Sequence, residues 1–217
     1  MNGILFDWDG VVIDSSACHE RSWELLAAEA GLPLPEDHFK KGFGKKNQEI
    51  IPNLLGWTSD PAEVQRLGDR KEELYRELVR ENGVEILPGV ETLLAALRHA
   101  GIRRAVASST PRANLDALFE STGLDRWFDA VVCGDDVVHG KPAPDVFLKA
   151  AEKLGVEPRD AVVIEDALVG IEAAHAGGIK VLAVATTNSL DQLGSADAAV
   201  RSLEEVTPAF LLSLLKS

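Results

Sequence analysis

Short apolar runs and amphipathic stretches alternate along most of the chain. Apolar runs that end in small or polar residues are typical of buried strands, whereas apolar positions three and four residues apart are typical of helices. Because strands that alternate with helices form parallel sheets, the pattern predicts an α/β protein built on a doubly wound parallel sheet. The predicted strands are Gly3–Phe6, Ala105–Ala107, Ala130–Cys133, Ala161–Ile164 and Val181–Val184, and two of the predicted helices are Glu91–Ala100 and Pro144–Leu154.

The segment that follows the first predicted strand has a different pattern. It shows successive helical stretches and no convincing strand, and turn-rich sequence lies at both of its ends, at Asp14–Ser16 and from Asn82 to Gly89. We therefore predict an all-helical cap domain of residues 15–82, carried on two hinges and inserted into a catalytic core of residues 1–14 and 83–217. The predicted helices of the cap are Cys18–Ala30, Lys46–Leu55 and Pro61–Arg80.

The composition is that of a folded protein, since 46% of the 217 residues are hydrophobic. The net charge of −13, without any block rich in lysine and arginine, argues against nucleic acid or an anionic membrane as a partner, because phosphate groups would be repelled over most of the surface. A small anionic substrate is still compatible with this charge, since the charge at a cleft matters more than the total.

The two cysteines, Cys18 and Cys133, are far apart and have no spacing that indicates a disulfide framework or a zinc site. A reducing cytoplasm is therefore the expected location. We see no targeting signal, and no run approaches the roughly 18 apolar residues of a membrane helix. We expect a cytoplasmic monomer or weak homodimer.

Asp7 and Asp9 end the first predicted strand and lie just before Gly10. The period of two in a strand places both carboxylates on one side and Trp8 on the other. One carboxylate can attack a phosphorus atom while the other moves a proton to and from the leaving oxygen, with a divalent cation holding the anions together. Such pairs of aspartates are also common on protein surfaces, so this motif indicates an active site only if other motifs in the chain support it.

Three further polar motifs follow predicted strands. Ser108–Thr110 offers hydroxyl and N–H groups at a helix start, and Lys141 lies between glycine and proline in the sequence Gly-Lys-Pro-Ala-Pro-Asp. Glu165 and Asp166 end the fourth predicted strand and provide oxygen ligands for a hard cation such as Mg²⁺. Each motif alone also fits a helix cap or a solvated loop. Unrelated motifs would be scattered over helices and loops, whereas all of these follow predicted strands, so together they indicate one site.

Taken together, these motifs resemble those of the haloacid dehalogenase superfamily of aspartate-nucleophile phosphotransferases, over nearly the full chain. The helical segment 15–82 resembles the small cap of its beta-phosphoglucomutase and phosphoglycolate-phosphatase branch, which implies a Rossmann-like core, Mg²⁺ as cofactor, and small phosphorylated metabolites, often sugar phosphates, as substrates. The four matching motifs are Asp7-Trp8-Asp9-Gly10, Ser108, Lys141 in Gly-Lys-Pro-Ala-Pro-Asp, and Glu165-Asp166 with Gly170.

The resemblance implies a role for each motif residue. Asp7 attacks the phosphoryl group to give an aspartyl-phosphate, while Asp9 protonates the leaving alkoxide and later deprotonates water. Lys141 offsets negative charge, and Ser108 with the N–H of Ser109 holds phosphoryl oxygens. The presence of Asp9 points to phosphate monoesters. The implied ligands of Mg²⁺ are Asp7, the backbone carbonyl of Asp9, Asp166 and Glu165, directly or through water.

Three residues are candidates for contacts with the substrate. His19 resembles a histidine that lies near the acid/base in the mutases, which makes it a candidate for a hydrogen bond to Asp9, although an exposed helix histidine is equally compatible. The loop Gly42–Lys46 falls where this branch binds its substrate, and Lys45 stands about where the mutase has an arginine, without that residue's bidentate fork. Arg112 either reaches the substrate or caps its helix.

The leading hypothesis is a magnesium-dependent phosphatase of a small phosphorylated metabolite, with a sugar phosphate favoured. Beta-phosphoglucomutase is the alternative, because it uses the same acids and differs in whether water or a sugar hydroxyl accepts the phosphoryl group. A non-catalytic metabolite-binding protein is the alternative from another class. It predicts loss of a chemical residue, whereas Asp7, Asp9, Lys141 and Asp166 are all present.

Overall fold

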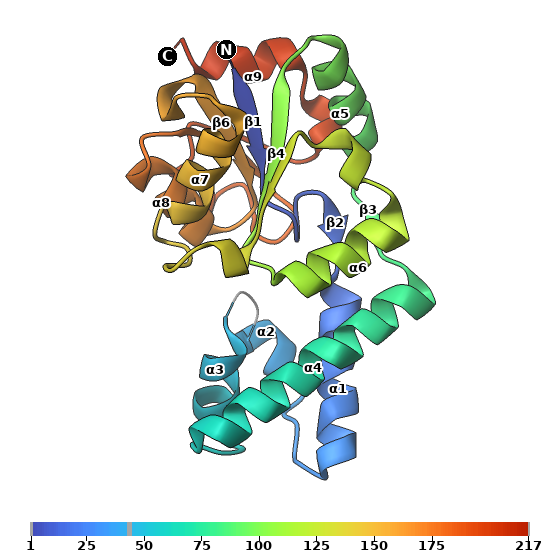
Figure 1. Ribbon diagram of the computed structural model, residues 1–217. Helices are drawn as coiled ribbons and strands as arrows, with labels where there is room; N and C mark the ends of the chain where they lie inside the picture. Colours follow the sequence, from blue (N-terminus) through green and yellow to red (C-terminus); the bar gives the residue numbers. More distant parts are fainter. Residues whose placement is uncertain (1, 43–44, 217) are drawn as a thin grey trace. The chain divides into compact units, whose positions relative to one another are not determined.

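The core of the molecule is a six-stranded parallel sheet in the order β5-β4-β1-β6-β7-β8 (Figure 1). A computed structural model describes residues 2–42 and 45–216. The chain adds β4 and β5 on one side of β1 and then crosses to the other side for β6, so β1 lies at the topological switch point, where ligands bind in open α/β sheets. The strands of this sheet are β1 Gly3–Phe6, β4 Arg103–Ala107, β5 Ala130–Val132, β6 Ala161–Glu165, β7 Lys180–Val184 and β8 Ala198–Val200.

Helices cover the sheet and bury its apolar strands. On one face, α7 and α8 pack against side chains such as Leu5, Val163 and Val181, each of which has no exposed surface (Figure 1). The helix α5 contacts β4, and α9 contacts β6. Strands buried on both faces are expected to be almost wholly apolar, as β1 and β6 are. The α-helices of this part of the chain are α5 Val90–His99, α6 Arg112–Thr122, α7 Asp145–Leu154, α8 Leu168–Ala176 and α9 Pro208–Leu214.

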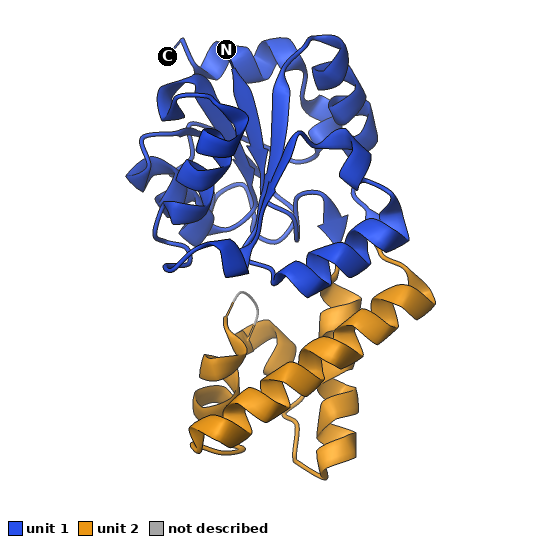
Figure 2. Ribbon diagram, viewed as in Figure 1, with its two compact units in different colours: residues 1–14, 85–217 blue, residues 15–84 orange. Residues whose placement is uncertain are grey.

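The chain divides into two compact units, shown in different colours in Figure 2. Unit 1 comprises residues 1–14 and 85–217 and contains the sheet, and unit 2 comprises residues 15–84. The α/β fold class with a doubly wound parallel sheet is confirmed. The proposed action of residues 15–82 as a hinged cap stays a prediction.

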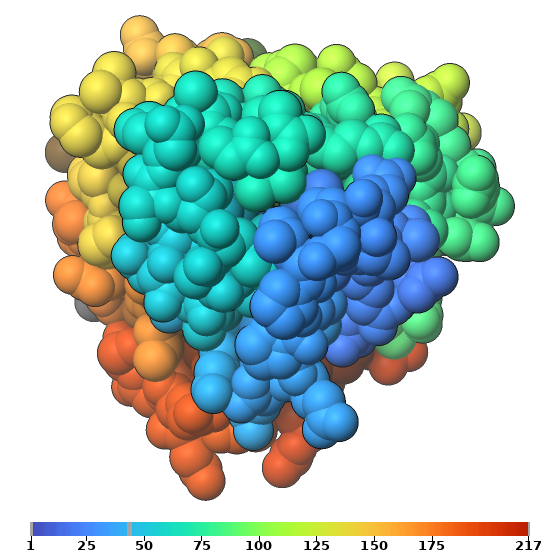
Figure 3. All heavy atoms as spheres, turned by 90° about the horizontal axis from the view of Figure 1, so that it is seen from below, coloured from blue at the N-terminus to red at the C-terminus, as the bar shows by residue number. Residues whose placement is uncertain are grey.

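The secondary structure of unit 2, within its described residues, consists of helices joined by loops. The helices α1 and α4 pack against each other, and their blue and teal atoms meet in Figure 3. Asp60 caps α4 by accepting the N–H of Glu63 at 2.9 Å, and Pro61 occupies the first turn, where no N–H is needed. Trp23 and Leu26 from α1 and Leu67 from α4 form the centre of its core. Its helices are α1 Ser16–Ala30, α2 His38–Gly42, α3 Asn47–Glu49 and α4 Pro61–Asn82.

The prediction of one continuous helix over Lys46–Leu55 is wrong. The segment is the short α3 followed by a π-helical turn, Ile50–Leu54, in which the N–H of Leu55 donates to the carbonyl of Ile50 at 2.9 Å. Pro52 lies within this turn and has no N–H, so a regular α-helical ladder cannot pass through it. None of the helices in the described part of the chain combines the length and the apolar character needed to cross a bilayer.

The sequence pattern did not indicate three short strands. Two of them, β2 Ile13–Asp14 and β3 Glu85–Ile86, form a separate antiparallel pair in unit 1. The third is β8 at the edge of the main sheet. β2 and β3 have two residues each, which is too short to show a hydrophobic period, and the edge strand β8 buries only Val200.

Candidate active site

The predicted site residues of unit 1 follow the carboxyl ends of neighbouring strands. Asp7 comes directly after β1, Ser108 directly after β4, and Glu165 ends β6 with Asp166 next to it. Asp7 extends the ladder by one further bond, from its N–H to the carbonyl of Ile164 at 3.0 Å. Parallel strands end at a common edge, so this topology gathers residues that are far apart in sequence.

Lys141 joins two of these acids. Its Nζ donates to Asp7 Oδ1 at 2.7 Å and to Glu165 Oε1 at 2.6 Å. The ammonium also lies 4.8 Å from the centre of the Phe147 ring, and the lysine side chain is only 7% exposed. Burial alone would lower the pKa of Lys141, but the carboxylates of Asp7 and Glu165 raise it above its ordinary value, so the ammonium stays charged.

Glu165 is held on both of its oxygens. While Oε1 accepts from Lys141, Oε2 accepts the N–H groups of Asp166 and Ala167 at 2.8 and 2.7 Å, where α8 is about to begin. Gly170 leaves room for this carboxylate, because a Cβ atom there would lie 1.8 Å from Glu165 Oε1. The glycine of the fourth motif is therefore required by the position of the acid.

Asp7, Glu165 and Asp166 form an acidic cluster whose ligand oxygens lie within 4.8 Å of one another. Carboxylate oxygens at this spacing are the donors that Mg²⁺, Ca²⁺ and Mn²⁺ prefer. Lys141 supplies one positive charge to three acids, so the cluster keeps an excess of negative charge. The donor set and this excess fit a divalent cation.

The crowding of the acids is visible in their pKa values. Burial raises the pKa of Asp7 to about 7, with Lys141 opposing the shift and Glu165 adding to it. Burial, followed by the charges of Glu165 and Asp7, raises the pKa of Asp166 to about 8. Without a cation, these carboxyl groups therefore hold protons near neutral pH.

Asp9 contacts the turn that follows β4. The hydroxyl of Thr110 donates to Asp9 Oδ2 at 2.6 Å, and the hydroxyl of Ser108 accepts the N–H of Thr110 at 3.0 Å. The turn after β4 therefore connects to the first motif through Thr110. The sequence places Thr110 in this turn without indicating a contact with Asp9, and the clue to it is the position of the turn after a strand that neighbours β1.

The predicted substrate contacts have other partners inside their own units. Arg112 pairs with Asp136, Nη2 to Oδ2, at 3.0 Å, and its N–H donates to Asp135, which satisfies the start of α6. The Nζ of Lys45 lies 3.8 Å from Glu49 Oε1. Residues 43 and 44 of the predicted binding loop lie outside the described residues. The substrate roles of Ser109, Lys45 and Arg112 stay predictions.

His19 lies against a buried lysine that the sequence did not single out. Its Nδ1 is 2.7 Å from Nζ of Lys71, and its ring stacks on Tyr75 with the centres 4.1 Å apart. Lys71 lies on α4, where a charged residue looks like part of a solvated face, yet only 4% of its side chain is exposed. The proposed hydrogen bond between His19 and Asp9 stays a prediction.

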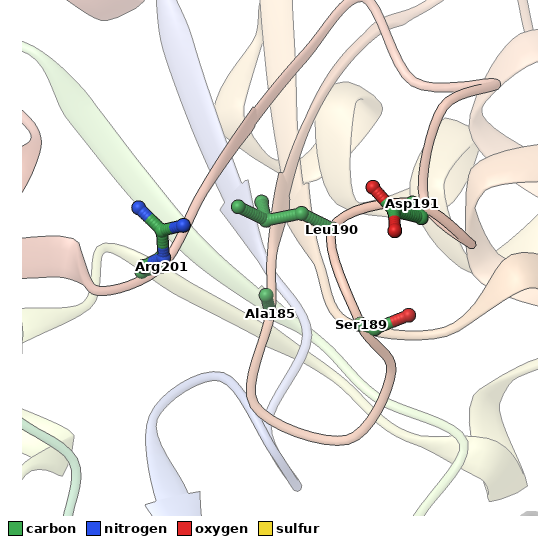
Figure 4. A pocket seen from close by; sticks show the side chains of 5 residues that line it. All are labelled: Ala185, Ser189, Leu190, Asp191 and Arg201. Atoms are coloured by element: carbon green, nitrogen blue, oxygen red, sulfur yellow. The ribbon is translucent and has the colours of Figure 1, made fainter.

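A hollow of about 420 Å³ on unit 1 is lined by none of the predicted site residues. Arg201 and Asp191 stand on opposite sides of it with Leu190 between them (Figure 4). Its lining residues are Ala185, Ser189, Leu190, Asp191 and Arg201. The candidate site is therefore the acidic cluster with Lys141 and Asp9, and the hollow borders the loop that follows β7.

Comparison with known proteins gives the same picture. The family model of haloacid dehalogenase-like hydrolases matches residues 1–178. The chain is 30% identical over 220 residues to a phosphorylated carbohydrates phosphatase of Thermotoga maritima, covering all of this chain and 99% of that protein. It is 32% identical over 213 residues to a beta-phosphoglucomutase of Bacillus subtilis, covering 95% and 92% of the two chains.

A chloroplast 5-amino-6-(5-phospho-D-ribitylamino)uracil phosphatase of Arabidopsis thaliana is 35% identical over 208 residues. The match covers 94% of this chain but only 55% of that relative. Among solved structures, a haloacid dehalogenase-type hydrolase of Entamoeba histolytica superimposes with a TM-score of 0.91 at 29% identity and covers the whole of both chains. The similarity thus extends over the sheet and the inserted helices.

Proposed function

Because the chain belongs to the haloacid dehalogenase-like hydrolase family, we propose that it is a magnesium-dependent phosphatase of small phosphorylated metabolites, with sugar phosphates as the substrate class. The observation that carries this proposal is Lys141, which bridges Asp7 and Glu165 while Asp166 lies in the same acidic cluster. Relatives named as phosphatases of phosphorylated carbohydrates support the substrate class.

In the proposed reaction, a carboxylate oxygen of Asp7 forms a bond to phosphorus as the bond to the ester oxygen breaks. Asp9 gives its proton to the leaving alkoxide, and Thr110 orients the Asp9 carboxyl group. In the second half, water attacks the phosphorus, its proton passes to Asp9, and phosphate leaves as Asp7 is restored. Lys141 stays charged throughout and offsets the negative charge on the transferring group.

Asp7, Glu165 and Asp166 are the residues that would hold Mg²⁺, together with the carbonyl of Asp9. The bound cation would polarise the phosphoryl oxygens and neutralise developing charge. Ser108 and the N–H of Ser109, at the turn after β4, are proposed to hold the remaining oxygens, and His19, Lys45 and Arg112 to contact the rest of the substrate.

We also propose a role for the helical segment, a cellular location and a class of partner. Residues 15–82 serve as the cap that excludes water and selects the substrate. Cys18 and Cys133 are both buried and neither forms a disulfide, which suits a reducing cytoplasm. The partner is a small phosphate ester rather than nucleic acid or a membrane, given the net charge of −13.

Beta-phosphoglucomutase is the second candidate function. The Bacillus subtilis relative of that name covers 95% of this chain, and the two activities use the same acids. In the mutase, a sugar hydroxyl takes the place of water in the second half-reaction. The two functions therefore differ in the acceptor and not in the first step.

One experiment tests both functions. Purified protein is incubated with sugar, polyol, nucleotide and glycolate phosphates, with and without Mg²⁺, and free phosphate is measured. In the same wells, beta-glucose 1-phosphate is followed for conversion to glucose 6-phosphate. Mg²⁺-dependent phosphate release from sugar phosphates supports the phosphatase, isomerisation without release replaces it with the mutase, and no change in any well contradicts both.

A further inference from the structure

The loop that follows β7 contacts both acid-bearing motifs of the candidate site. We propose that Thr187, in this loop, is a positioning residue whose hydroxyl fixes the carboxylate of Asp166 in the orientation that receives a divalent cation. This inference rests on the proposed function and adds to it a residue outside the four motifs.

The contacts to Asp166 come from two adjacent residues. The hydroxyl of Thr187 donates to Asp166 Oδ2, and the side-chain amide of Asn188 donates to the backbone carbonyl of Asp166 at 2.9 Å. Asp166 is 3% exposed. Because one carboxylate oxygen and the carbonyl are both held, rotation of the acid would break a partly buried hydrogen bond, and the second oxygen is left for a cation.

A third contact ties the same loop to the first motif. The hydroxyl of Thr186 donates to the carbonyl of Gly10. Gly10 has a φ of +79°, and a Cβ atom there would lie 2.1 Å from Asp166 Oδ2 and 2.9 Å from Thr187 Oγ1. The backbone of the first motif, the acid of the fourth and the hydroxyl of Thr187 are therefore packed directly together, with no space for the acid to move toward Gly10.

The chemistry of the donor suits this role. Asp7 and Glu165 share the ammonium of Lys141, whereas Asp166 accepts a hydrogen bond from a neutral hydroxyl. A neutral donor orients a carboxylate without cancelling its charge. Once deprotonated, Asp166 thus has a negative charge that no neighbouring hydroxyl cancels and that attracts the cation, and mutation of such outer partners typically weakens metal binding.

The remainder of the loop offers a matched control. Ser189 lines the hollow beside Arg201, and its hydroxyl donates to Gln192 Oε1 at 2.9 Å rather than to Asp166 (Figure 4). Ser189→Ala therefore removes a loop hydroxyl two positions from Thr187 without touching the acids. It separates the effect of the Asp166 contact from any general loosening of the loop.

The test is calorimetric titration of the whole protein with Mg²⁺ at pH 8, without substrate, for wild type, Thr187→Val, Thr187→Ser and Ser189→Ala. We expect Thr187→Val to raise the Kd for Mg²⁺ roughly 10- to 100-fold. Thr187→Ser, which keeps the hydroxyl, and Ser189→Ala are expected to stay within about threefold of wild type. Circular dichroism and the Tm in EDTA check that each variant folds, and Thr187→Ala replaces Thr187→Val if the latter does not.

The outcomes separate this inference from the proposed function. If wild type binds Mg²⁺ and releases phosphate but Thr187→Val binds Mg²⁺ equally well, Thr187 does not position Asp166 and the proposed function stands. Equal weakening by valine and serine would also overturn the inference, because the hydroxyl would not be responsible. Absence of Mg²⁺ binding by wild type would overturn the magnesium-dependent function and the inference with it.

Discussion

Each unit of the molecule contains a buried lysine, and the two lysines have contrasting surroundings. Lys141 in unit 1 lies between the carboxylates of Asp7 and Glu165. Lys71 in unit 2 contacts the imidazole of His19 and Glu72 Oε1, and its Nζ lies 5.3 Å from the centre of the Tyr75 ring. The first lysine lies between two carboxylates, whereas the second contacts one carboxylate, an imidazole and an aromatic ring.

The difference teaches that burial alone does not identify a catalytic lysine. Lys141 contacts a cluster in which three acids outnumber the one lysine. Binding of a metal cation or of an anionic substrate would therefore change the net charge of this cluster. Lys71 pairs with Glu72 Oε1 at 3.1 Å, and it is not part of the acidic cluster of Asp7, Glu165 and Asp166. We therefore place the chemistry in unit 1 and expect unit 2 to act on substrate selection.

The largest expected effect comes from removing one acid beside Lys141. Asp7→Asn should lower phosphate release at least about a thousandfold, because the nucleophile is lost while the side chain keeps its size. The fold should persist, since a crowded negative charge is removed. Phosphate release and circular dichroism measure both effects, and substantial remaining turnover would show that Asp7 is not the nucleophile.

Replacing each buried lysine by methionine tests the comparison directly. Lys141→Met leaves Asp7 and Glu165 without their ammonium, and breaking a buried pair in this way typically costs about 3–5 kcal/mol. We expect turnover of an aryl phosphate to fall more than about a hundredfold, since charge stabilisation of the transition state is lost.

Lys71→Met is the matched variant in unit 2. It should change aryl phosphate turnover by less than about tenfold, because a methionine fills a similar volume and the acidic cluster is intact. Initial rates and thermal unfolding of both variants provide the measurement. Equal losses of turnover for the two lysines would remove the distinction between the units.

The pH dependence of stability should reveal the acids around Lys141. The pKa values of Asp7 and Asp166 are raised from the ordinary 3.8 to about 7 and about 8. The cation-free folded protein thus keeps protons that the unfolded chain releases near pH 4, so this stabilisation is complete below pH 4 and is lost as the pH rises through 7 to 8.

We therefore expect the Tm in EDTA to fall between pH 5 and 8. Mg²⁺ should raise the Tm more at pH 8 than at pH 5.5, because protons compete with it at the lower pH. Calorimetry at several pH values with EDTA or Mg²⁺ measures both trends, and Asp7→Asn should flatten the slope in EDTA. A Tm in EDTA that rises over this range would contradict the assignment.

The smallest effect is expected from an exposed lysine of unit 2. Lys45→Ala should raise KM for the physiological sugar phosphate several-fold, because an electrostatic contact is lost, and leave the hydrolysis of an aryl phosphate nearly unchanged. Lys41→Ala serves as a control, since its Nζ pairs with Asp37 at 2.6 Å. Equal effects of Lys45→Ala on both substrates would show that the residue does not select the substrate.

The fold and the gathering of the acids could be predicted because they depend on repeated local patterns. Apolar runs marked the main strands, and the rule that parallel strands end at one edge placed Asp7 near Asp166. The contacts of Thr110 with Asp9 and of Thr187 with Asp166 could not be predicted, because each joins a loop to a distant residue without any periodic signal. The pairing of Arg112 with Asp136 could not be predicted for the same reason.

The antiparallel pair β2–β3 makes the inserted segment a replaceable module. Asp14 pairs with Glu85, so the chain leaves unit 1 and returns to it at adjacent positions. The length and sequence between these positions can vary while the distance to be closed stays constant, and longer connections add little entropic cost. Natural or engineered exchange of residues 15–84 can thus diversify the chain without rebuilding the sheet that carries Asp7.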